Sequence, residues 1–175
     1  MDLKEYYTIL YTILIGLTIL LYLKKGGELI QIRQHAIYVS VPILWSCAFI
    51  ILLLKTYRAI ITTNTNPYMI WVAIGSTACY YWIGMLLFPS TQQIDPQNQF
   101  VYFDYYEHFR KQHQWIMGLA LLAFLFVFFI SLNKAYSYSD YIMIGLFGLA
   151  FFTEHKGLMC LLSWGMLSLL IFEIL

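Results

Sequence analysis

The stretch Pro89–Gln114 (PSTQQIDPQNQFVYFDYYEHFRKQHQ) decides the organisation of this chain, because it separates two long apolar halves. Its first half is rich in amide side chains and contains an Asp95-Pro96 step, whereas its second half mixes aromatic and charged residues. Aromatic rings beside charges are typical of the boundary between a membrane and water. We therefore predict that 89–114 is a central interfacial loop with three helices on either side.

The composition of the chain predicts a membrane protein. Of the 175 residues, 61% are hydrophobic and only 11% are charged, whereas about a quarter are charged in an average soluble domain. The formal net charge is +1 and no run of basic residues occurs, which argues against nucleic acid as a partner. We expect one integral-membrane domain over 1–175, with the lipid bilayer as its principal partner.

Apolar runs long enough to cross a bilayer, which takes about 20 residues, occur on both sides of the loop. The runs that meet this length or nearly so are Tyr6–Leu23, Ala36–Leu54, Tyr68–Phe88, Trp115–Leu132 and Gly157–Leu175. A further run, Tyr138–Phe152, is shorter and spans only if Tyr136, Tyr138 and Tyr141 lie at headgroup level. The predicted fold class is all-α, a polytopic transmembrane helical bundle of about six spans. Five spans plus a re-entrant segment is the alternative.

The distribution of Lys and Arg predicts the orientation. With six spans, the connections on one face carry Lys24, Lys25, Arg33, Arg110, Lys111 and Lys156, and those on the other carry Lys4, Lys55, Arg58 and Lys134. The positive-inside rule then places the central loop in the cytoplasm or matrix and both termini outside. Frequent Ile, Phe and Tyr suit an A/T-rich genome, so we expect a bacterial inner membrane or a mitochondrial inner membrane.

Acidic, basic and histidine side chains are missing from the middle of all six predicted spans. Proton relays and ion-coupled transporters normally need such residues inside the membrane, so a pump or an ion-coupled carrier is disfavoured. Haem ligation between helices would also need a buried histidine. The three cysteines lie singly in apolar runs and suggest neither a disulfide framework nor a thiolate metal site. We predict no metal and no cofactor.

The third predicted span is the most polar one. Small and hydroxyl-bearing residues occupy its middle: Gly75, Ser76, Thr77, Cys79, Tyr80 and Tyr81. Helical spacing puts Thr77 and Tyr81 on one face, and small residues let a neighbouring backbone approach. In the second span, Pro42 removes a backbone donor and is expected to kink the helix. The candidates for a packing face, with a pore lining or ligand groove as the alternative, are Ser76, Thr77, Tyr80, Tyr81 and Pro42.

All histidines fall on the face that carries the central loop: His35, His108, His113 and His155. If Phe100–Gln112 is an amphipathic interfacial helix, Asp104 and His108 lie one turn apart, as a general base or a metal ligand requires. His155 precedes the sixth span and completes the minority set of catalytic candidates. The spacing of His108 and His113 is not that of a helical metal pair, so histidines in contact with solvent or headgroups are the favoured interpretation. We assign no catalytic residue.

Three functions fit these features. The favoured one is a non-catalytic structural or accessory subunit of a larger membrane complex, such as a respiratory one, in contact with other membrane subunits or with copies of itself. A small homo-oligomeric channel or membrane-disrupting effector, lined by the second and third spans, is the first alternative. An interfacial lipid-modifying enzyme that uses the histidine-bearing face is the second. No motif of the common soluble enzyme classes occurs, which favours a non-enzymatic role.

Overall fold

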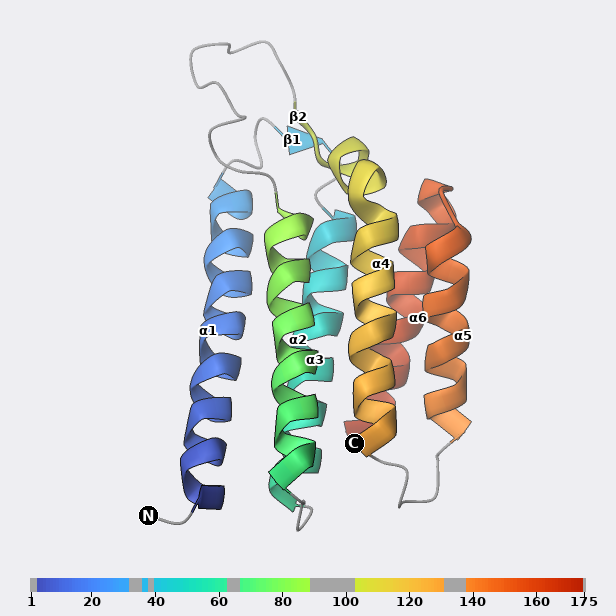
Figure 1. Ribbon diagram of the computed structural model, residues 1–175. Coiled ribbons are helices and arrows are strands. Elements are labelled where there is room, and N and C mark those ends of the chain that lie inside the picture. The colour runs from blue at the N-terminus through green and yellow to red at the C-terminus, as the bar shows by residue number, and fades with distance from the viewer. Residues whose placement is uncertain are drawn as a thin grey trace.

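The described residues form six helices, which pack as a bundle in the computed structural model of the protein (Figure 1). The structure describes residues 3–31, 36–37, 40–62, 67–88, 103–130 and 138–174. Within these ranges the helices are α1 (Leu3–Gln31), α2 (Ser40–Thr62), α3 (Pro67–Leu87), α4 (Tyr105–Ile130), α5 (Tyr138–Phe152) and α6 (Lys156–Ile174). The predicted all-α fold class and the predicted number of helices are confirmed.

Two very short strands lie at one end of the bundle (Figure 1). β1 (Ala36–Ile37) pairs in parallel with β2 (Phe103–Asp104), so that Ala36 faces Phe103 and Ile37 faces Asp104. β1 belongs to the connection between α1 and α2, and β2 leads directly into α4. The pairing therefore joins two connections that the sequence predicts on the same face.

Among the described residues, four helices are long and apolar enough to cross a membrane. These candidate spans are Glu5–Glu28, Val41–Arg58, Ile70–Leu87 and Tyr105–Phe128. The apolar segments of α5 and α6, Tyr141–Phe152 and Lys156–Phe172, are shorter. The helices are thus compatible with a membrane location, and α5 differs most from a full-length span, as its short apolar run had indicated.

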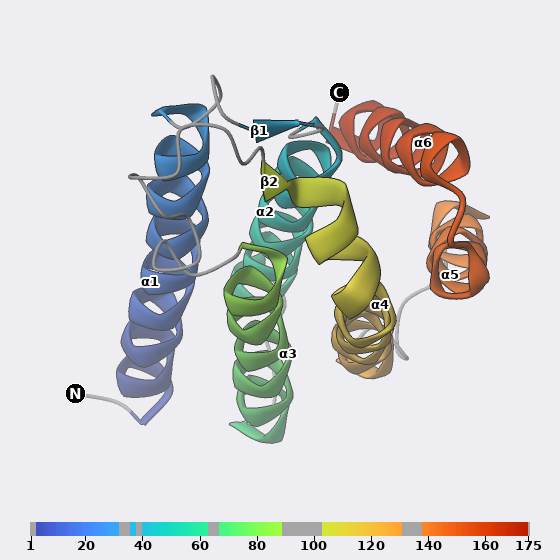
Figure 2. The same cartoon turned by 90° about the horizontal axis from the view of Figure 1, so that it is seen from above.

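The helices pack in two rows. α3 and α4 lie in front of α2 and α6, with α1 and α5 at opposite ends of the arrangement (Figures 1 and 2). The most extensive contact is between α3 and α4, and α2 packs against α1, α3, α4 and α6. Each helix also contacts the next one along the chain and runs in the opposite direction (Figure 1). Because the number of helices is even, the first and last helices have their free ends at the same end of the bundle, as predicted.

The fourth helix starts earlier than predicted, and this corrects the boundary of the central loop. α4 begins at Tyr105 and runs without a break for 26 residues, so the last part of the predicted loop forms its first turns. The side chains of Tyr105 and Phe109 are buried in the protein core instead of facing lipid. From Tyr105 onward, the expected separate helix over Phe100–Gln112 is therefore the beginning of α4. Residues 89–102 lie outside the described part of the chain.

The first helix is also longer than its apolar run. α1 continues past the predicted end at Leu23 to Gln31. Lys25 and Glu28 lie one turn apart on this extension and form an ion pair, with 3.4 Å between Lys25 Nζ and a carboxylate oxygen of Glu28. Such pairs stabilise exposed helix turns by a few tenths of a kcal/mol, roughly 0.2–0.5. The polar end of α1 thus remains helical beyond the predicted span.

Pro42 was expected to kink the second helix, but its position in the structure gives no reason for a kink. α2 begins at Ser40, so Pro42 lies in its first turn, where backbone amides have no acceptor within the helix. A proline at this position removes no helical hydrogen bond. Its carbonyl accepts a hydrogen bond of 2.7 Å from the Ser46 hydroxyl, and α2 continues as a single helix to Thr62.

Candidate functional site

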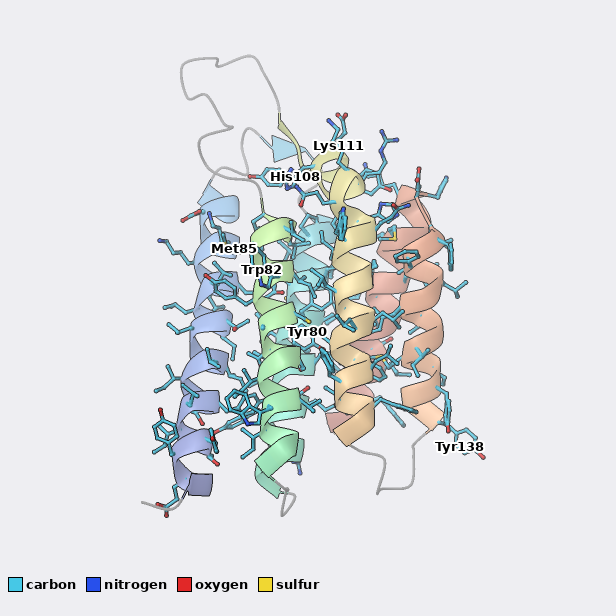
Figure 3. All side chains as sticks on the ribbon, in the orientation of Figure 1. Tyr80, Trp82, Met85, His108, Lys111 and Tyr138 are labelled. Atoms are coloured by element: carbon cyan, nitrogen blue, oxygen red, sulfur yellow. The ribbon has the colours of Figure 1, made fainter. Side chains whose placement is uncertain are left out.

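The buried face of α3 carries three of the five predicted packing or pore residues. The side chains of Ser76, Thr77 and Tyr80 are 0, 2 and 1% exposed, and Tyr80 lies at mid-height of the bundle (Figure 3). They share one face because residues three and four positions apart are neighbours on a helix. Ala73 and Ile83 extend the same buried face in both directions. The hydroxyl-bearing side chains of Ser76, Thr77 and Tyr80 therefore face the interior of the bundle.

The other two predicted residues lie elsewhere. Tyr81 is 42% exposed, because one step along a helix rotates the side chain by about 100° from that of Tyr80. Pro42 is buried in the first turn of α2, at the end of the bundle where α3 finishes (Figure 1). The structure thus brings Ser76, Thr77 and Tyr80 together but not Tyr81 or Pro42.

α1 and α2 supply the surroundings of the buried α3 face. The Tyr22 hydroxyl of α1 donates to the carbonyl of Tyr80 at 2.8 Å. On α2, the ring of Phe49 lies 6.1 Å from that of Tyr80 and stacks on Trp45 at 5.6 Å. Tyr11 of α1 is completely buried. Tyr22 of α1 and Phe49 of α2 therefore place aromatic side chains against Tyr80 on the buried side of α3.

Hydrogen bonding within this site is incomplete. The Thr77 hydroxyl donates to the carbonyl of Ala73 at 3.0 Å, a common arrangement for threonine inside a helix. Other buried polar atoms have no partner within the described residues, namely the hydroxyls of Tyr11, Ser76 and Tyr80 and the indole nitrogen of Trp45. An unpaired buried donor costs about 1–3 kcal/mol, so such atoms require an explanation. The polar side chains of this region are uncharged hydroxyl and indole groups.

The predicted catalytic candidates occupy separate places. His108 lies at the start of α4, where its Nε2 is 3.2 Å from the carbonyl of Leu86 (Figure 3). Leu86 is in the last turn of α3, whose carbonyls lack partners within the helix, so His108 caps α3. His155 is exposed between α5 and α6, with its ring beside Gly157. The side chain of Asp104 lies outside the described part.

Other polar groups at this end hold helices together. The Tyr106 hydroxyl donates to the carbonyl of Glu154 at 2.7 Å, and the Lys156 amine lies 5.5 Å from the centre of the Tyr106 ring. These contacts fasten the start of α4 to the connection between α5 and α6. Within the described ranges, no group of three or more His, Cys, Asp or Glu side chains could hold a metal ion. The arrangement suits structural contacts between helices.

His113 is a buried residue that sequence reasoning placed in the loop. Its side chain is 4% exposed, and Nδ1 lies 2.7 Å from the carbonyl of Arg110. Because a carbonyl can only accept, Nδ1 donates in this contact, and Nε2 is buried without a partner among the described residues. The loop was expected to continue to Trp115, where the apolar run begins. The recurrence of Tyr105, Phe109 and His113 at four-residue spacing was the signal available in the sequence.

No protein-family model matches the chain, and no match was found among curated proteins or solved structures. The structure combines an interior of hydroxyl and aromatic groups with an outer surface of large apolar side chains, which include Trp71, Trp82, Trp115, Leu149, Phe152 and Trp164. Such a surface can contact lipid or the helices of other proteins.

Proposed function

We propose that this protein is a multi-pass integral membrane protein that acts as a non-catalytic structural or accessory subunit of a larger membrane complex. Apart from His113, the polar side chains that are buried among the described residues carry hydroxyl groups: Thr18, Ser46, Thr56, Ser76, Thr77 and Ser163. Carriers driven by ions normally place charged side chains in the interior. An interior of this kind supports a role in assembly more than one in coupled transport.

The observation that carries the proposal is an open glycine face on α5. A Cβ atom added at Gly145 or Gly148 would meet no atom of the described residues within 4 Å. Ile142 and Leu149 lie on the same face and are 50 and 59% exposed. Small residues are typical of contacts between membrane helices, because they let two backbones approach closely. This face therefore suits a helix of another subunit.

The length of α5 adds to this argument. Its 15 residues extend about 22 Å at about 1.5 Å per residue, whereas the hydrocarbon core of a bilayer is about 30 Å thick. α5 lies at one end of the bundle and packs mainly against α4 and α6 (Figure 2). A partner helix beside it would shield the ends of this short helix from lipid. α1, at the opposite end, has 29 residues and does not need such cover.

Photo-crosslinking in the native membrane tests the proposal. A photoreactive amino acid replaces Leu149 on α5 or, as a control, Leu20 on α1, which is 60% exposed and thus equally accessible. We expect position 149 to form an adduct with a different membrane protein and position 20 to form adducts with lipid. Mass spectrometry of the adduct from position 149 would identify the partner.

Substitution of the open glycines provides a second readout. Gly145→Leu should abolish co-purification of the crosslinked partner, because the new side chain fills the proposed contact. Gly16→Leu on α1 is the matched control, because a Cβ there also meets no described atom within 4 Å. Co-purification should persist in this variant. Adducts between two copies of the chain at position 149 would instead favour the homo-oligomeric channel. Lipid adducts alone at both positions would contradict a partner at α5.

A further inference from the structure

Charged side chains gather at the end of the bundle where α5 connects to α6. Glu154 and Lys156 follow directly after the apolar segment of α5, which ends at Phe152. The start of α4 lies against this connection, because the Tyr106 hydroxyl donates to the Glu154 carbonyl at 2.7 Å. In a bundle that crosses a membrane, charged and tyrosine side chains just beyond an apolar segment lie at the level of the lipid headgroups.

Two cations from different helices lie near the Tyr106 ring. The Lys156 amine, at the start of α6, is 5.5 Å from the centre of this ring. Arg110 is four residues after Tyr106 on α4, so the two share one side of that helix. Side chains on a helix lean toward its N-terminus, so the Arg110 side chain extends over the turn that carries Tyr106.

Arg110 and Glu154 are exposed charges that take part in no ion pair within the part of the chain that the structure describes. Lys111 differs from them, because it pairs with Glu107 at 3.3 Å at the same end of the bundle (Figure 3). The Glu154 backbone is fastened to Tyr106, whereas its carboxylate remains available. This surface therefore offers two cations and one carboxylate around a single tyrosine.

We propose that Arg110, Lys156 and Glu154 bind the headgroup of an ethanolamine phospholipid. The phosphate of this headgroup is negative and suits the guanidinium and the amine, and its ammonium donates hydrogen bonds that suit the carboxylate. A glycerol headgroup has the phosphate but no cation, so it would place its negative charge near Glu154 without compensation. A choline headgroup has a cation that carries no N–H group to donate.

The surface below the charges favours a lipid over a soluble phosphate compound. Phe152 lies two residues before Glu154 and is 85% exposed, so it can contact acyl chains while the headgroup binds above it. Its ring also packs edge-on against that of Phe151, which in turn contacts α4 at Gly118. The inference does not depend on the proposed partner at α5, because it concerns α4 and the connection to α6.

Native mass spectrometry of the intact protein released from nanodiscs tests the site. The nanodiscs contain equal amounts of phospholipids with choline, ethanolamine and glycerol headgroups and identical acyl chains. We expect the ethanolamine lipid to be retained most, and Arg110→Gln to lower its retention about fivefold. Lys111→Gln is the matched control, because it removes the same charge from a residue that is already paired, and retention should persist. Equal retention of the three lipids by the wild type would overturn the proposal, as would equal losses in the two variants.

The variant Glu154→Gln tests the choice of headgroup, because it removes the carboxylate and keeps the shape of the side chain. Retention of the ethanolamine lipid should fall and that of the glycerol lipid should rise, since the like charge beside the phosphate is gone. Unchanged preferences in this variant would contradict the role of Glu154. Soluble phosphoethanolamine, added at the concentration of the lipid, should not displace it. Displacement at that concentration would contradict a lipid as the occupant.

Discussion

α3 and α5 are both apolar helices with two glycines each, but the surroundings of these glycines are opposite. In α3, a Cβ added at Gly84 would lie 3.0 Å from the Leu21 side chain and 3.1 Å from the Tyr22 ring, both on α1. In α5, a Cβ at Gly145 or Gly148 would meet nothing within 4 Å in the part of the chain that the structure describes. α3 is enclosed by α1, α2 and α4, whereas α5 lies at one end of the bundle (Figure 2). The same residue type closes a contact within the chain in one helix and leaves a face open in the other.

The largest expected effect is that of Gly84→Leu. The new side chain would push Leu21 and Tyr22 away and break the hydrogen bond from Tyr22 to the Tyr80 carbonyl. Overpacking of this kind typically costs 1–3 kcal/mol, and we expect about 3 kcal/mol of the free energy of unfolding to be lost. Denaturant titration of the purified variant and wild type in mild detergent measures this loss of the free energy of unfolding.

Gly145→Leu is the matched control for Gly84→Leu, because it adds the same side chain on an open face. Its effect on the free energy of unfolding should stay within about 0.5 kcal/mol, as at other exposed positions. Equal losses in both variants would break the comparison between α3 and α5.

Thr77→Leu should have the next largest effect. Thr77 is 2% exposed and faces the interior, so the longer side chain must displace its neighbours at a cost of about 2 kcal/mol. Thr77→Val keeps the shape and removes only the hydrogen bond to Ala73, which is worth about 1 kcal/mol. Thermal and denaturant unfolding would rank the variants. A Thr77→Leu variant as stable as the wild type would indicate an open pore along α3.

His108→Ala tests the contact at the end of α3, and His155→Ala is its comparison at an exposed position. His108→Ala removes the contact with the Leu86 carbonyl and should cost about 1 kcal/mol. His155 is exposed, so His155→Ala should change the free energy of unfolding by less than about 0.5 kcal/mol. Both variants should still assemble with the partner in the co-purification assay. Loss of function in both, with stability intact, would favour the lipid-modifying enzyme.

The smallest expected effect is that of Tyr81→Leu, which tests which side of α3 faces inward. Tyr81 is 42% exposed, and its replacement by another apolar side chain should alter the free energy of unfolding by less than about 0.5 kcal/mol. Tyr80→Leu, one residue away, should cost severalfold more, because Tyr80 is buried against Phe49. Similar losses in the two variants would show that both sides of α3 are packed.

The positions of α3 and α5 followed from the sequence, whereas α2 (Ser40–Thr62) is displaced from its predicted run, Ala36–Leu54. The apolar runs at Tyr68–Phe88 and Tyr138–Phe152 agree within one residue with α3 and α5. Such runs are reliable because backbone groups in an apolar medium must bond to one another, which favours helices. The start of α4 could not be predicted from an apolar run. Its first turns are polar on one side, and only the burial of Tyr105 and Phe109 against other helices makes them part of the bundle.

The sequence by itself predicted that this chain is all-α, favoured six helices over five with a re-entrant segment, and placed hydroxyl groups in α3. Only the tertiary structure decided that Tyr80 faces inward and Tyr81 outward, that His113 is buried, and that the glycines of α5 are open while Gly84 is covered. The physical reason is that a helix apolar on all sides carries little periodicity to mark its inner face. Which side is buried then depends on the helices that pack against it.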